Sequence, residues 1–90
     1  MKTVTVDCIG IETAEAFHCA LAQALEFPDH YGKNLDALFD CLTENRTDLE
    51  LILNNWHALT YRLGDWSGKV LYVFRCACDD NRHLTVTLHP

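Results

Sequence analysis

The sequence predicts an α/β fold, with a three-stranded parallel sheet packed with about four helices. Three short segments have strand composition, and a stretch of helical periodicity separates each from the next. Strands that are joined through helices, rather than through tight turns, pair in parallel with right-handed crossovers. The length of 90 residues allows one modest core, so we expect residues 1–90 to form a single domain.

The first strand is expected at residues 3–7, where valines alternate with polar residues. Thr13 is a suitable N-cap for a helix that runs to about Leu25, and Pro28 follows its end. We expect His18 on the outer side of this helix. The inner side is predicted to consist of Phe17, Ala20, Leu21, Ala24 and Leu25.

The next helix is expected to begin near Leu35, because Asn34 is a good N-cap and Gly32 permits a tight entry. Its apolar stripe has helical spacing and consists of Leu35, Leu38, Cys41 and Leu42.

The second strand is expected at residues 49–53, and Asn54 and Asn55 can initiate a helix that Gly64 ends. Ser67 or Trp66 is expected to open the last helix. Its apolar stripe is predicted from Val70, Val73, Phe74 and Ala77, widened by Leu71, and residues 84–88 alternate as a third strand.

The composition limits the possible functions. A net charge of -6 and a pI near 5.1 disfavour direct binding of nucleic acid, because phosphates would be repelled. The same charge would attract a basic protein partner. We find neither a signal peptide nor an apolar run that could span a membrane, so a cytoplasmic location without membrane association is the expectation.

The five cysteines are an odd number without a C-x-x-C framework, so reduced thiols are expected. We expect Cys8, Cys19 and Cys41 to be small buried hydrophobic residues. A metal site could be assembled only from Cys76, Cys78, His83 and His89, whose spacing completes no tetrahedral set. We therefore expect no metal and no cofactor, and no spacing of nucleophile and base indicates an enzyme.

Asp36, Asp40 and Glu44 recur every four residues along the helix that begins near Leu35. Like charges at this spacing repel, and no Lys or Arg within the helix compensates them. Phe39 lies among these acids rather than on the leucine stripe. The pattern fits an ordinary solvated face, and it also fits an anionic recognition helix with an aromatic anchor.

Residues 31–43, Tyr-Gly-Lys-Asn-Leu-Asp-Ala-Leu-Phe-Asp-Cys-Leu-Thr, resemble the signature of the barstar family. Members of this family are small intracellular inhibitors of secreted microbial ribonucleases. The resemblance extends to residues 25–28, 70–75 and 84–88. It implies the same fold, a three-stranded parallel sheet with helices packed against it.

The resemblance also implies a mechanism, in which carboxylates of the inhibitor replace RNA phosphates in the active site of a basic, barnase-like, guanyl-type ribonuclease. Asp40 matches the central acid of the family, and Phe39 stands where the family usually has Trp. His30 and Cys76 depart from a well-known member, which has Tyr and Glu there. The expected partner-binding residues are His30, Tyr31, Gly32, Asn34, Leu35, Asp36, Ala37, Phe39, Asp40, Thr43, Glu44 and Cys76.

One alternative is an immunity or regulatory protein of the same fold that binds a different basic nuclease or toxin. A small enzyme would need a nucleophile and a base that the spacing does not offer. A purely structural interaction domain would be expected to present an uncharged interface in place of the acids.

Overall fold

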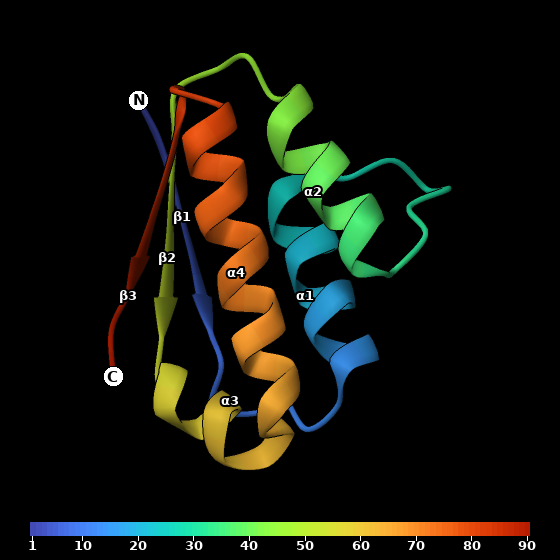
Figure 1. The fold of residues 1–90 in the computed structure, drawn as a ribbon, viewed down its shortest axis with the longest axis vertical. Coiled ribbons are helices and arrows are strands. Elements are labelled where there is room, and N and C mark those ends of the chain that lie inside the picture. Colours follow the sequence, from blue (N-terminus) through green and yellow to red (C-terminus); the bar gives the residue numbers. More distant parts are fainter.

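A computed structural model describes all 90 residues (Figure 1). Strands β1 (Lys2–Asp7), β2 (Leu49–Asn54) and β3 (Leu84–Leu88) form a parallel sheet in the order β1-β2-β3. In the register of the sheet, Leu51 of the central strand lies between Val4 and Val86. The predicted three-stranded parallel sheet is confirmed.

Four helices connect the strands: α1 (Ala14–Leu25), α2 (Leu35–Glu44), α3 (Trp56–Leu63) and α4 (Asp65–Asp80). Figure 1 shows α1, α2 and α4 on one side of the sheet and α3 beyond the ends of the strands. Helix α1 packs against β1 and α4 against β3, whereas α2 lies farther from the strands. The main packing partner of α2 is α4 rather than the sheet. One face of α2 is therefore free to contact another molecule.

The core lies between the sheet and the helices. Its residues recur along each strand and helix with the period of that element. Along β2, Leu49, Leu51 and Leu53 are buried and alternate with half-buried residues, as expected for a strand with one face on the core. Phe17 of α1 packs edge-on against Trp56, with ring centroids 6.4 Å apart. Full burial of such a side chain contributes about 1.5–3 kcal/mol to folding.

The caps of the first two helices are as predicted. The hydroxyl of Thr13 accepts a hydrogen bond from the N–H of Ala16 at 3.0 Å, and the Asn34 side chain accepts one from Ala37 at 2.8 Å. Each such cap is worth about 1 kcal/mol. The caps therefore fix the starts of α1 and α2 locally.

Two predicted details of α3 and α4 need correction. Asn55 holds the N-cap position of α3 with a φ of 58°, but it makes no capping bond. Its side chain instead donates to Asp7 Oδ1 at 2.7 Å. Helix α4 begins at Asp65, just before the predicted start, because Gly64 with φ 54° both ends α3 and precedes α4.

The prediction that His18 lies on the outer side of α1 is wrong. His18 is 2% exposed and shares the buried side of the helix with Phe17 and Leu21. A hydrogen bond to the hydroxyl of Tyr31 compensates the loss of water around its ring.

The predictions for the three thiols differ in outcome. Cys8 is buried as expected, whereas Cys19 is exposed and that prediction is wrong, because Cys19 lies on the outer side of α1. Cys41 is half-buried and not buried as expected, and all five cysteines are free. None of the helices is both long and apolar enough to cross a membrane.

Candidate protein-binding site

The acidic residues of α2 lie on its exposed side without a positive partner in the protein. Asp36, Asp40 and Glu44 are all exposed, and none takes part in an ion pair. The two ion pairs of the protein lie elsewhere, between Lys2 and Glu26 and between Asp48 and His83. Three uncompensated carboxylates therefore form a row along one helix face, and we call this row the acidic row.

The segment before α2 is folded tightly. The Tyr31 N–H donates to the Pro28 carbonyl at 2.9 Å, and Lys33 has a φ of 51°, in the left-handed region. A Cβ on Gly32 would lie 3.1 Å from Nδ2 of Asn34, closer than such atoms normally approach. Glycine at this position therefore lets the capping side chain sit against the backbone.

A small hollow lies between this segment and α2, next to the acidic row. Its volume is about 200 Å³. Six of the twelve residues that the sequence predicted for partner binding line it: His30, Tyr31, Gly32, Ala37, Asp40 and Glu44. We call it the acidic hollow, because it brings two carboxylates of the acidic row to one concave surface.

The other lining residues of the acidic hollow are Pro28 and Cys41, which the sequence did not suggest as binding residues. Burial, followed by the nearby Glu44 and Asp40, raises the pKa of the Cys41 thiol. Burial also raises the pKa of the Tyr31 hydroxyl. Both groups are therefore neutral at pH 7, and Asp40 and Glu44 supply the negative charge of the hollow.

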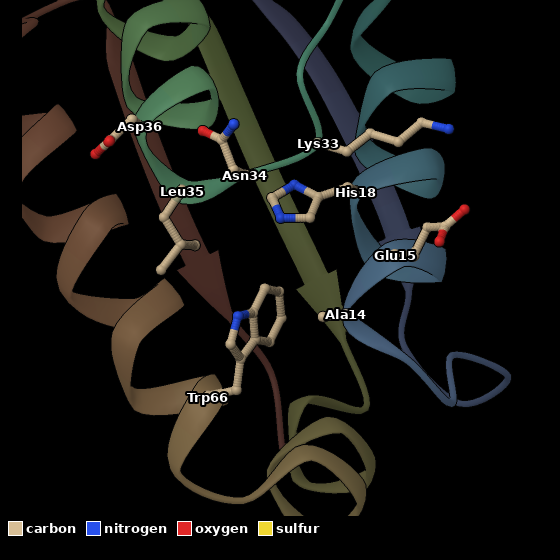
Figure 2. Close-up of a pocket in the computed structure, with 8 residues that line it drawn as sticks. All are labelled: Ala14, Glu15, His18, Lys33, Asn34, Leu35, Asp36 and Trp66. Carbon is tan, nitrogen blue, oxygen red and sulfur yellow. The ribbon is translucent and has the colours of Figure 1, made fainter.

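A second, larger hollow of about 560 Å³ lies at the start of α2 (Figure 2). The structure brings Asn34, Leu35 and Asp36 together here with residues of α1 and α4. His18 and Trp66 also line it, and sequence reasoning gave neither a site role. The burial of His18 could have been recognised from its position three residues before Leu21, because residues at this spacing share one side of a helix.

Three predicted residues lie outside both hollows. Phe39 is half-buried and packs against the core, so only part of its ring is free to contact a partner. The Thr43 hydroxyl donates to the carbonyls of Phe39 and Asp40 at 2.9 and 3.2 Å. Cys76 is half-buried on α4, the helix that packs on α2.

Asn81 holds the C-terminal end of α2, a role that the sequence did not suggest. The side chain is 2% exposed, and its amide donates to the carbonyls of Leu42 and Asn45 at 2.9 and 2.7 Å. Carbonyls in the last turn of a helix lack intrahelical donors. Asn81 therefore ties α2 to the segment that follows α4 and fixes the direction of the acidic row.

No group of three or more His, Cys, Asp or Glu side chains is arranged to hold a metal ion.

Comparison with known proteins identifies a matching family model and a similar protein. The family model Barstar (barnase inhibitor) matches residues 1–89. A protein of Bacillus subtilis (strain 168), named "Putative ribonuclease inhibitor YrdF", is 38% identical over 81 residues, which cover 89% of each chain.

Proposed function

The chain belongs to the barstar family of barnase inhibitors, and from this premise we propose that it blocks a barnase-like, guanyl-type ribonuclease with the acidic row of α2. Proteins of this family are inhibitors and not enzymes. The partner is accordingly a ribonuclease. The observation that carries the proposal is the acidic hollow, where Asp40 and Glu44 meet the segment before α2.

In the proposed mechanism, carboxylates of the inhibitor occupy positions that RNA phosphates would take in the nuclease. A ribonuclease active site is cationic because it must bind a polyanion. Asp36, Asp40 and Glu44 have no positive partner in their own chain, so binding breaks no internal ion pair. The carboxylates are therefore available to pair with Arg, Lys or protonated His of the enzyme.

The acidic hollow can receive a side chain of the nuclease. Asp40 and Glu44 can flank one basic side chain that enters from the nuclease, while the neutral Tyr31 and Cys41 line the hollow. Desolvation strengthens the attraction between paired charges. The exposed half of Phe39 and the adjacent Thr43 would contribute packing around the central acid. His30 lies at the hollow in place of the tyrosine of a well-known family member.

We place this activity in the cytoplasm, where the inhibitor would protect cellular RNA from a nuclease of the same or a neighbouring cell. No direct contact between the inhibitor and nucleic acid is involved, because a net charge of -6 repels phosphates.

The test is a titration of the protein into a barnase-like ribonuclease while RNA cleavage is followed. We expect inhibition at a 1:1 ratio. Asp40→Ala should weaken the complex by about 3 kcal/mol or more, because it leaves cationic groups of the enzyme buried without a partner. A loss below about 1 kcal/mol would remove Asp40 from the proposed role.

Glu50→Gln is the matched control for this titration. It also removes one negative charge, but Glu50 alternates with the core-facing leucines of β2 and therefore lies on the sheet face away from the helices. We expect it to inhibit like the wild type. If the wild type and Glu50→Gln both fail to inhibit a guanyl-type enzyme, the alternative is a different basic nuclease or toxin. That alternative is tested by pull-down with the wild-type and Asp40→Ala proteins.

A further inference from the structure

A third hollow, of about 260 Å³, lies between the C-terminal ends of α1 and α2. Most of its lining is apolar and includes Leu25, Phe27, Leu42 and Leu49, so we call it the apolar groove. Leu25 and Phe27 are only half-buried, and part of each side chain is open to solvent. A cavity of about 150 Å³ holds a benzene ring, so the groove has room for one aromatic or leucine side chain.

The apolar groove and the acidic hollow are neighbours on one surface. Pro28, Cys41 and Glu44 line both of them, so these three residues form a shared wall. Glu44 is exposed on this wall and is also the last residue of the acidic row. A protein that places a basic side chain in the acidic hollow therefore lies directly beside the apolar groove.

The polar groups at the α2 end of the groove are already bonded within the protein. The Asn45 side-chain amide donates to the Thr47 carbonyl at 2.6 Å. The backbone carbonyls of Leu42 and Asn45 accept from the Asn81 amide at 2.9 and 2.7 Å. Apolar contact is consequently what this end of the groove offers to another molecule.

The segment that separates the two hollows is held in place. The Phe27 N–H donates to the Ala22 carbonyl at 2.9 Å, and the Phe27 ring packs against Tyr31 with centroids 4.9 Å apart. Tyr31 is in turn bonded to the buried His18. Both hollows therefore keep their shape in the free protein, which lowers the entropic cost of binding a partner.

The charges around the groove select the kind of partner. Glu26 and Glu44 are its only charged lining residues, and Glu26 is paired with Lys2 at 3.6 Å. A groove that is apolar inside and acidic at its rim fits an apolar side chain with basic neighbours. A ribonuclease presents such a basic surface because it binds a polyanion. A second copy of this chain, with its net charge of -6, would be repelled.

We propose that the apolar groove receives one aromatic or leucine-sized side chain of the ribonuclease, next to the basic side chain that enters the acidic hollow. The inference rests on the proposed function and extends its contact surface from α2 to the end of α1. An apolar group in the groove excludes water from Glu44 on the shared wall. The attraction between Glu44 and a cation of the enzyme is then stronger, because water no longer screens it.

The test compares variants as inhibitors of a barnase-like ribonuclease. Leu25→Gln keeps the size of the side chain but makes it polar, and we expect it to weaken inhibition about tenfold. Leu25→Met stays apolar and should inhibit within about twofold of the wild type. Leu71→Gln is the matched control, because Leu71 lines a separate apolar hollow between α4 and β3 and should leave inhibition unchanged.

The salt dependence separates apolar contact from charge. The loss in Leu25→Gln should be the same at about 0.05 and 0.5 M salt, because screening acts on charges. If Leu25→Gln and Leu71→Gln both inhibit like the wild type while Asp40→Ala does not, the groove lies outside the interface and the proposed function stands. If the wild type does not inhibit, the proposed function and this inference both fail.

A measurement on the wild type avoids any effect of the substitutions on folding. In protein with ¹³C-labelled leucine methyl groups, the nuclease should shift the Leu25 signals and leave those of Leu71 in place. Unshifted Leu25 signals in a complex that forms would overturn the proposal. It would also be overturned if the Leu25 signals shifted with the concentration of the protein alone, because a second copy would then occupy the groove.

Discussion

The imidazole of His18 and the hydroxyl of Tyr31 form a buried hydrogen bond in which Nδ1 lies 2.6 Å from the tyrosine oxygen. The bond links α1 to the segment that leads into α2. Tyr31 also lines the acidic hollow, so one of its sides faces the proposed binding site while its hydroxyl is held by the core. This bond therefore couples the stability of the fold to the position of the site.

Tyr31→Phe should lower the free energy of unfolding by about 1–2 kcal/mol, because it leaves Nδ1 of a buried histidine without a partner. The ring and its packing remain, so the change isolates the hydrogen bond. Urea unfolding followed by circular dichroism measures the effect. Tyr61→Phe is the control, since Tyr61 is 91% exposed and should change the stability little. Equal stability of the two variants would show that the bond contributes nothing.

The stability should fall in mild acid because of His18. Burial lowers the pKa of this histidine in the folded protein below its ordinary value of 6.5. The unfolded chain then binds the proton more readily than the folded one, so unfolding becomes more favourable as the pH falls. The contribution is fully present above pH 6.5, decreases below it, and levels off under the lowered pKa of the folded state.

An NMR titration of the His18 ring measures that pKa directly, and urea unfolding between pH 5 and pH 7.5 measures the accompanying loss of stability, both about the range where histidine titrates. A His18 midpoint above 6.5 would reverse the sign of the expected dependence.

Local signals in the sequence predicted most of the fold. Alternating valines and leucines indicated the strands, and Thr13 and Asn34 indicated the starts of α1 and α2, because a cap depends only on residues within one turn. Asn55 was less predictable, since its side chain bonds to Asp7, which lies 48 residues away in the sequence. Contacts between distant segments leave no such local pattern.

The candidate site also contains some features that the local sequence predicts and others that depend on distant residues. The acidic row was visible as a repeat of four residues, and the resemblance to a family supplied the residues around it. The burial of His18 could not be predicted from polarity, because it depends on Tyr31, thirteen positions later. Asn81 likewise became recognisable only once the end of α4 was seen beside the end of α2.

Asn81→Ala should lower the free energy of unfolding by about 2–3 kcal/mol, because two backbone carbonyls at the end of α2 lose their donor. Urea unfolding measures the effect. Asn54→Ala is the control, since the half-buried Asn54 side chain at the end of β2 does not hold a helix end. We also expect faster hydrogen exchange in the last turn of α2 in Asn81→Ala alone. An unchanged exchange rate there would mean that Asn81 does not hold the helix end.

The association rate with the nuclease should depend on salt, if the acidic row guides the encounter. Exposed charges attract a basic partner over about 10 Å at 0.1 M salt, and this reach shrinks as salt increases. Glu44 lies exposed at the end of the row, so Glu44→Gln should reduce the association rate constant about two- to fivefold at low salt. Because Glu44 also lines the acidic hollow, the dissociation rate constant should rise as well.

Stopped-flow measurements at about 0.02 and 0.5 M salt would separate these effects, because the higher concentration leaves a screening length of only a few ångströms. Glu50→Gln carries the same net charge as Glu44→Gln but changes the sheet face away from the helices. Equal rates for the two variants would mean that only the total charge matters. If only Glu44→Gln associates more slowly, and the difference disappears at high salt, the charges that attract the nuclease lie on α2.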